Sequence, residues 1–340
     1  MEQGLGVIAM SLDTPCPFIL SILLGVFLIT LQLPVSTDAE YKRYVFWTDE
    51  GTGKIERVEL DGSNREEIIG GLTGVRGFDV DGGRERLYFT IGPAPGKVQA
   101  VNFDGKGFVS LVTAGPDGVT PLGELNGLAL DQWNYKMYWA EVDALGVGNI
   151  LRANFVEGDR NVELVLTGLN TPQEILYDNM FGTIWWTDSG AGQLGEAERN
   201  GTVLAVDNLP GIWGFRGDRI NRVLYWTDTT RKSIWEDDDR GGLGPREIVT
   251  GLNKPTGIDL DMVNEKIYWI DETDKKIMRA NFDGSGSEDV LTGLVLPRYV
   301  RIADAPLPGA RPVRVVPFSN KYVLMALLAL LGGWLVFRKR

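Results

Sequence analysis

The sequence predicts an all-β fold, a six-bladed β-propeller made of four-stranded antiparallel blades. Three observations predict it. An aromatic tetrapeptide recurs six times, Asp-Gly or Asn-Gly turns recur in phase with it, and helical periodicity is almost absent over residues 44–304. The chain has 340 residues, of which 44% are hydrophobic and 24% charged, so it is long and apolar enough to bury a large core.

Residues 1–39 are expected to form a signal peptide or an N-terminal anchor. A charge-free apolar run over residues 18–33 is followed by small or polar residues that suit cleavage near Ala39. The segment before the run carries Glu2 and Asp13 but no basic residue, so an uncleaved anchor or a start codon placed too early stays open as an alternative. Cys16 is the only cysteine, so cleavage near Ala39 would leave a chain without a thiol.

Residues 40–304 carry one motif written six times, at intervals of 40 to 50 residues. Repeats of this length are typical of stacked structural units that share one continuous core. Because the aromatic residues recur at the repeat spacing, we expect them to be core residues rather than a binding site. The six copies are 46–49 (FWTD), 88–91 (YFTI), 138–141 (YWAE), 185–188 (WWTD), 225–228 (YWTD) and 268–271 (YWID).

Tight turns follow the tetrapeptides in phase. Asp61-Gly62, Asp104-Gly105, Asn200-Gly201 and Asp283-Gly284 tolerate the positive φ angles of hairpins, so each lies between two strands. Each period therefore holds four short strands. A small sheet that is apolar on both faces cannot stand alone in water, and radial stacking of six such sheets buries both faces.

The phase of the repeat predicts how the ring closes. The first copy opens at a second strand, residues 44–48, whereas the last copy supplies a surplus inner strand, residues 299–303. Pairing these two strands completes the first blade and removes two exposed sheet edges.

These repeats resemble the class B, or YWTD, repeats of low-density lipoprotein receptors over roughly 260 residues. Residues 54–65 (KIERVELDGSNR) are a near-consensus copy of that family's second motif. The resemblance implies a binding propeller. It does not imply receptor-type endocytosis, because this chain lacks the cysteine-rich modules that flank the propellers of the animal receptors.

The acidic residues that end the tetrapeptides are expected to hold the fold together. Each would bind neighbouring backbone or an arginine such as Arg57, Arg152 or Arg279. The residues in question are Asp49, Asp188, Asp228 and Asp271.

A binding site is expected where equivalent positions of the repeats differ, on the face where loops enter the inner strands. Arg76 and Arg298 would become neighbours on ring closure and could bind a carboxylate of a partner, beside amides and one Trp. Alternatively, each Arg pairs with a nearby acid such as Glu124 or Glu174. The predicted ring of partner-binding residues at the channel mouth is Arg76, Asn126, Gln173, Trp213, Thr256 and Arg298.

An enzyme is the less favoured hypothesis. The chain has no histidine, which removes the usual general base and the commonest zinc ligand, and its net charge of −12 disfavours nucleic acid. No catalytic residue, metal site or cofactor is predicted, since the acids at the channel-lining positions are matched by arginines. A propeller hydrolase or lactonase using Asp79 or Asp259 stays open as the alternative. The channel positions are Asp79, Ala129, Leu176, Arg216, Asp259 and Arg301.

The C-terminal part is expected to attach the propeller to a membrane. Residues 305–320 form a Pro-rich linker, and residues 321–340 hold an apolar stretch that ends in Arg338, Lys339 and Arg340. A C-terminal membrane anchor and a processed sorting tail are both compatible with this pattern. The sequence thus predicts hydrophobic helices at both ends of an extracytoplasmic, membrane-anchored monomer that binds a protein or peptide at the cell envelope or surface.

Overall fold

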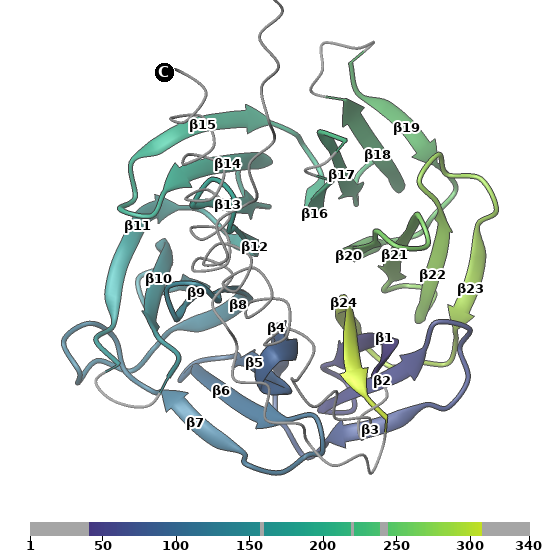
Figure 1. The fold of residues 1–340 in the computed structure, drawn as a ribbon. Helices are drawn as coiled ribbons and strands as arrows, with labels where there is room; N and C mark the ends of the chain where they lie inside the picture. The colour runs from purple at the N-terminus through teal and green to yellow at the C-terminus, as the bar shows by residue number, and fades with distance from the viewer. Residues whose placement is uncertain (1–40, 157–159, 219–220, 239–243, 308–340) are drawn as a thin grey trace, which may run out of the picture.

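The computed structural model describes residues 41–156, 160–218, 221–238 and 244–307. It contains six four-stranded antiparallel sheets, which stand around a common axis as the blades of a propeller (Figure 1). The predicted fold class and the number of blades are therefore confirmed.

Each blade runs from an inner strand beside the axis to an outer strand at the rim (Figure 1). Apart from one short 3-10 turn, η1 (Gly82–Arg84), the elements of the described chain are strands. Blade 1 is composed of β24 (Pro297–Pro306), β1 (Tyr41–Asp49), β2 (Lys54–Glu59) and β3 (Glu66–Ile69). Blade 2 is composed of β4 (Val75–Asp81), β5 (Arg86–Ile91), β6 (Lys97–Asn102) and β7 (Val109–Val112).

The other four blades follow in chain order. Blade 3 is composed of β8 (Glu124–Asp131), β9 (Lys136–Val142), β10 (Gly148–Asn154) and β11 (Glu163–Leu169). Blade 4 is composed of β12 (Pro172–Asp178), β13 (Thr183–Asp188), β14 (Gln193–Glu198) and β15 (Val203–Asn208). Blade 5 is composed of β16 (Ile212–Asp218), β17 (Val223–Asp228), β18 (Ser233–Asp238) and β19 (Arg246–Val249). Blade 6 is composed of β20 (Pro255–Asp261), β21 (Lys266–Asp271), β22 (Lys276–Asn281) and β23 (Glu288–Leu291).

The ring closes by antiparallel pairing of β24 with β1, as predicted. The register runs from Tyr41 opposite Pro306 to Asp49 opposite Pro297, so both strands are longer than the sequence pattern suggested. The predicted propeller boundary at residue 304 is consequently too early. Ala305 is fully buried and belongs to β24 rather than to the linker.

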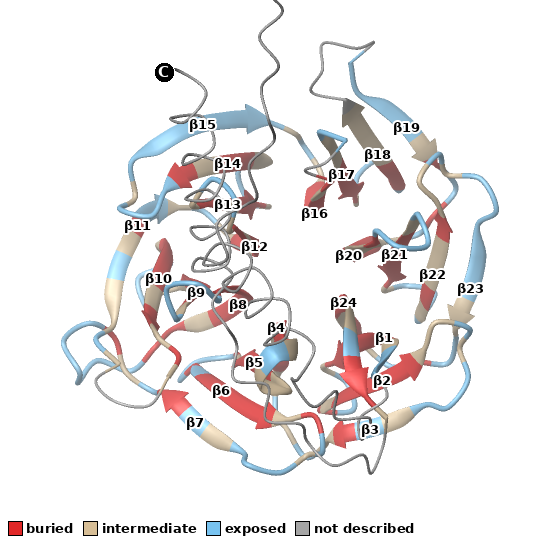
Figure 2. Ribbon diagram, viewed as in Figure 1, coloured by how far each residue is buried: buried red, intermediate tan, exposed pale blue. Residues whose placement is uncertain are grey.

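The core is divided among the contacts between neighbouring blades. Six clusters of buried apolar side chains occur, one at each of the six blade-to-blade interfaces. At one of them, the rings of Tyr138 and Tyr177 stack with centroids 5.4 Å apart. The second residue of every tetrapeptide is buried, which confirms the aromatic repeat as core (Figure 2).

The Asp residues that end the tetrapeptides lie on the second strands and accept hydrogen bonds from backbone N–H groups of loops and turns. Asp49 accepts hydrogen bonds from the backbone N–H groups of Thr52, Val295 and Leu296. Asp188 and Asp271 accept backbone N–H groups of loops in the same manner, and Asp228 accepts two from the turn that follows it, so the predicted role in holding backbone is confirmed.

The three arginines named as possible partners of these Asp residues pair elsewhere, although Asp228 does pair with another arginine, Arg231, at 3.2 Å. Arg57, Arg152 and Arg279 lie near the outer strands, and each pairs with a glutamate there. Arg279 of blade 6 also donates to the carbonyl of Leu60 at 2.7 Å, which links it to blade 1. The glutamates concerned are Glu66, Glu163 and Glu288.

The hydrophobic helices predicted for both ends, within residues 1–39 and 321–340, fall outside the described residues. Within the described ranges, no helix has the length and hydropathy needed to cross a bilayer.

Replacing Asp49 with Ala should lower the free energy of unfolding by about 2–4 kcal/mol, because three backbone N–H groups lose the buried carboxylate that accepts their hydrogen bonds. Urea unfolding followed by fluorescence measures this loss. Asp283→Ala is the control, since Asp283 accepts hydrogen bonds only in an exposed hairpin turn and should cost less than about 1 kcal/mol. Equal losses in the two variants would contradict the role assigned to Asp49.

Candidate functional site

Three of the four tetrapeptide threonines fix the backbone at the mouth of the channel. Each of three threonines donates its hydroxyl to the carbonyl of a predicted mouth residue on the next blade. Each hydroxyl belongs to a buried Thr of one blade, and each carbonyl belongs to an inner strand of the next blade. Because both groups are part of a sheet, these hydrogen bonds hold the backbone of the mouth residues rigidly. The pairs are Thr90 with Asn126 at 2.6 Å, Thr187 with Trp213 at 2.7 Å and Thr227 with Thr256 at 2.7 Å.

Glycines next to the mouth residues let the inner strands approach one another closely. A Cβ atom on Gly127 would lie 2.3 Å from the Gln173 carbonyl oxygen, and one on Gly257 would lie 2.6 Å from the Arg298 carbonyl oxygen. Two blades lack this glycine. Blade 4 has Glu174 at the position and blade 1 has Tyr299.

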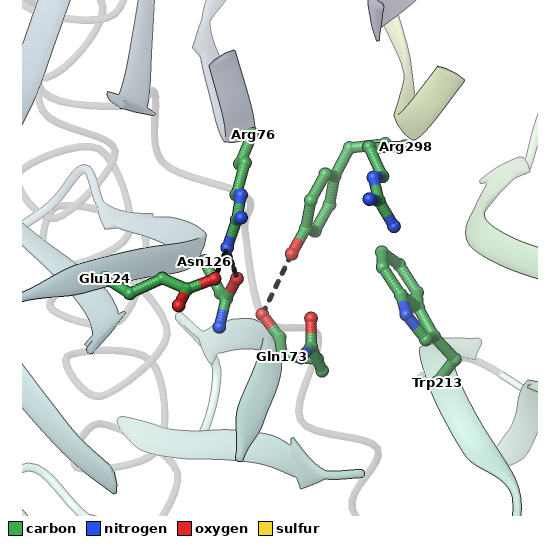
Figure 3. Close-up of a pocket in the computed structure, with 7 residues that line it drawn as sticks. Arg76, Glu124, Asn126, Gln173, Trp213 and Arg298 are labelled. Atoms are coloured by element: carbon green, nitrogen blue, oxygen red, sulfur yellow. Dashed lines mark hydrogen bonds and ion pairs between the residues drawn. The ribbon is translucent and has the colours of Figure 1, made fainter. Parts of the chain in front are cut away.

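A pocket of about 190 Å³ lies at the mouth. Arg76, Glu124 and Asn126 lie on one side of it, Trp213 and Arg298 on the other, and Gln173 between them (Figure 3). Five of the six predicted ring residues therefore line one pocket. Thr256 is the exception, since it is fully buried and does not line the pocket. The complete lining is Arg76, Glu124, Asn126, Gln173, Trp213, Arg298 and Tyr299.

Tyr299 spans the axis beneath the pocket. Its hydroxyl, which comes from blade 1, donates to the carbonyl of Gln173 on blade 4 at 3.2 Å. Its ring packs against Trp213, with centroids 4.9 Å apart. Burial raises the pKa of the Tyr299 phenol above its ordinary value, which keeps the hydroxyl protonated as a donor. The pocket is thus closed below by two buried aromatic rings.

The two mouth arginines are held by carboxylates. Arg76 binds Glu124 and donates to Asn126 Oδ1 at 2.8 Å. Arg298 donates to Glu50 Oε2 and to Glu272 Oε2, each at 2.9 Å. Glu50 also lies 3.6 Å from Arg76 Nε, so one carboxylate lies between the two guanidinium groups. The expected cationic spot is therefore neutralised by acidic side chains, and the Glu124 pairing is the one that the ion-pair alternative anticipated.

A second charged network fills the channel below the mouth. Arg216 Nε lies 2.9 Å from Asp259 Oδ1, and Arg301 Nε lies 3.8 Å from Asp79 Oδ1, so the predicted matching of two acids with two arginines is confirmed. Fully buried Glu174 lies between the arginines, 2.8 Å from Arg301 Nη2 and 3.4 Å from Arg216 Nη1. Glu174 therefore belongs to the channel and not to a mouth arginine, as the alternative pairing had it.

The channel carboxylates also join neighbouring blades. Asp79 accepts the backbone N–H of Leu130 at 2.9 Å, and Asp259 accepts that of Ile302 at 2.7 Å. Burial raises the pKa of the Asp79 carboxyl above its ordinary value, although Arg301 favours the charged form. In the described part of the chain, no three acidic or sulfur-bearing side chains gather in a way that could hold a metal ion.

Sequence reasoning missed three residues of this region, Glu50, Glu272 and Tyr299. It named Glu174 only as a possible partner of a mouth arginine. A comparison of repeat positions contained the signal of all four. Glu50 and Glu272 directly follow the tetrapeptides of blades 1 and 6, where other blades have Gly92, Val142, Ser189 and Thr229. Glu174 and Tyr299 replace glycine in a position that is otherwise glycine. The first departure provides the carboxylates that hold Arg298, and the second places Tyr299 and Glu174 in the channel.

Comparisons with known proteins agree with this architecture. No family model matches the chain. A protein of Pyricularia oryzae described as low-density lipoprotein receptor-related protein 1 is 28% identical over 252 residues, which cover 64% of this chain and 81% of that protein.

Two solved structures show the same fold. A chain in the crystal structure of a nidogen/laminin complex superposes with a TM-score of 0.63 and 19% identity, covering 77% of this chain and 98% of that chain. A gluconolactonase of Xanthomonas campestris superposes with a TM-score of 0.54 and 13% identity, covering 69% of this chain and 84% of that chain. At these identities, the likeness concerns the fold alone.

Glu174→Ala should destabilise the protein by about 3–5 kcal/mol, because it leaves two buried arginines without their shared carboxylate. Glu124→Ala is the matched control. The Glu124 side chain is 47% exposed, so losing its pair with Arg76 should cost about 1 kcal/mol or less. Chemical unfolding of both variants measures the difference, and a stability of Glu174→Ala close to that of wild type would contradict this account of the channel.

Proposed function

We propose that this chain, a six-bladed propeller of the low-density lipoprotein receptor class B (YWTD) type, is a non-catalytic protein that binds a protein or peptide partner through the mouth pocket. The observation that carries the proposal is the convergence of Arg76, Gln173, Trp213 and Arg298 on one rigid cavity. Arginine and tryptophan are the residue types that dominate binding energy at protein interfaces.

The size of the pocket favours a side chain of a peptide over a larger free ligand. Sites for drug-sized molecules commonly exceed about 300 Å³, whereas this pocket measures about 190 Å³. One carboxylate or amide side chain, or the carboxyl end of a peptide, fits that space. Trp213 supplies an apolar wall beside it.

The ion pairs at the mouth suggest how such a group is recognised. Glu124 is half-exposed and holds Arg76 from the solvent side, so a carboxylate of the partner can take its place. Glu50 and Glu272 keep Arg298 in position and are more buried. Recognition is then an exchange of one carboxylate for another on a preorganised arginine, which costs little rearrangement.

An extracytoplasmic location is part of the proposal. This chain shares sequence with the receptor-related protein and its fold with a chain of the nidogen/laminin complex. By its description, that complex is an assembly of two proteins. The apolar runs in residues 18–33 and 323–337 support export and attachment to a membrane, with the propeller acting as a monomer.

A hydrolase or lactonase is the second candidate, favoured by the likeness to the gluconolactonase fold. It would use Asp79 or Asp259. Each of these carboxylates pairs with an arginine and accepts a backbone N–H of the next blade, which supports a structural role instead. A lactone turnover that is present in the wild type and lost in Asp259→Asn would favour the enzyme.

Peptides selected from a random library on the full chain should bear an acidic or amide group that enters the pocket. Arg298→Ala and Arg76→Ala should weaken their binding roughly 10- to 100-fold, measured by fluorescence anisotropy, because each removes a charge-assisted donor. Arg246→Ala is the matched control, since Arg246 forms an exposed ion pair with Glu236 on the outer strands. Unchanged affinity in both mouth variants would rule out this pocket as the binding site.

A further inference from the structure

The two faces of the propeller differ in the side chains that they expose. Every inner strand starts at the mouth and ends at the opposite face, which is also where β1 begins at Tyr41 and β24 ends at Pro306. We call this second face the terminal face. The turns between first and second strands of the blades lie on it, as do the turns between third and fourth strands.

Exposed aromatic side chains gather on the terminal face. The mouth face exposes three large aliphatic side chains, Val119, Leu145 and Val295, and no aromatic one within the described ranges. On the terminal face, five aromatic side chains are exposed. They are Tyr41, Phe108, Trp133, Tyr135 and Phe181.

The inner turns of the terminal face carry the most exposed of these groups. Trp133, in the turn between β8 and β9, is 61% exposed. Met180 and Phe181, in the turn between β12 and β13, are each 68% exposed, and Val263, between β20 and β21, is 71% exposed. Large apolar groups at the tips of turns on three different blades contribute nothing to the core, and such groups indicate a contact surface.

We infer that the terminal face rests on the surface of a lipid bilayer, with Trp133, Met180, Phe181 and Val263 entering the interfacial region. The inference rests on the membrane attachment proposed above. Trp and Phe are side chains that partition into this region, because an apolar ring fits the boundary between headgroups and acyl chains.

The position of the chain ends favours a bilayer over another occupant. Both ends of the described fold leave from this face, at Tyr41 and near Pro306, and the sequence beyond each end contains an apolar run. The run at residues 323–337 is separated from Pro306 by 16 residues, and a chain of that length can span at most about 60 Å. An anchor at this distance keeps the terminal face at a high effective concentration near the membrane. A contact of low intrinsic affinity between this face and the lipid is then sufficient to keep the face on the bilayer.

The net charge of the chain favours one class of lipid headgroup for this contact. With a net charge of −12, the protein is repelled by anionic headgroups, so zwitterionic phosphatidylcholine is the appropriate surface. Apolar insertion, and not attraction between charges, must then supply the contact.

The test uses the full chain with Cys16→Ser, reconstituted into phosphatidylcholine vesicles that contain brominated phosphatidylcholine. A fluorescent NBD group is attached to Met180→Cys on the terminal face or, as the matched control, to Val119→Cys on the mouth face, which is 81% exposed. Bromolipid should quench the probe at position 180 and leave the probe at 119 unquenched. Adding Trp133→Ser, Phe181→Ser and Val263→Ser should abolish the quenching at 180, whereas adding Leu145→Ser should not change it.

Flotation of the vesicles separates this inference from the proposed anchor. If the chain floats with the vesicles but the two probes are quenched equally or not at all, the anchor stands and the terminal-face contact is overturned. If the chain does not float, both are overturned. A blue-shifted probe at 180 without bromolipid quenching would mean that a second copy or another segment of this chain covers the face, which also overturns the inference.

Discussion

Covering both faces of small sheets is the constraint on which the rest of this structure depends. A four-stranded blade with large aromatic residues on both sides is stable only when a blade packs on each face. The six apolar clusters lie one to each interface, so every blade depends on two neighbours. The β24–β1 pairing closes the ring, so the first and last blades also pack against two neighbours. Asp49 strengthens this closure, because it accepts hydrogen bonds from the backbone of Val295 and Leu296, at least 246 residues further along the chain.

The same packing prepares the candidate site. The tetrapeptide residues on the second strand serve two purposes, because the buried aromatic residue fills the interface while the Thr hydroxyl holds a mouth carbonyl of the next blade. Inner-strand glycines then bring the strands close together around the axis. Where glycine is absent, Tyr299 lies beneath the pocket and Glu174 joins the buried charge network of the channel.

The fold was predictable because it is periodic. Six tetrapeptides, their turns and the surplus inner strand determine the blade number and the closure, although pairing carried β24 through Ala305 and Pro306, beyond the sequence pattern. The site was predictable in part, since aligned positions identified Arg76, Asn126, Gln173, Trp213 and Arg298. The pairing of Arg298 with Glu272, and of Arg76 with Glu50, joins side chains across blade boundaries, and a linear alignment does not measure those distances. Thr256 occupies an equivalent position but does not line the pocket, because its short side chain is fully buried.

The geometry of the repeat also separates the two surfaces that are assigned to function. All inner strands run in the same sense along the axis, so a position within the repeat determines the face on which a side chain lies. An inner strand of seven residues, such as β4, spans roughly 23 Å at 3.3 Å per residue. A propeller that rests on lipid through its terminal face therefore holds the mouth pocket about that far from the headgroups and directs it away from the membrane. The proposed orientation therefore accounts for the polar pocket and the apolar turns together, because turning the terminal face to a bilayer would leave the opposite face open to a partner in solution.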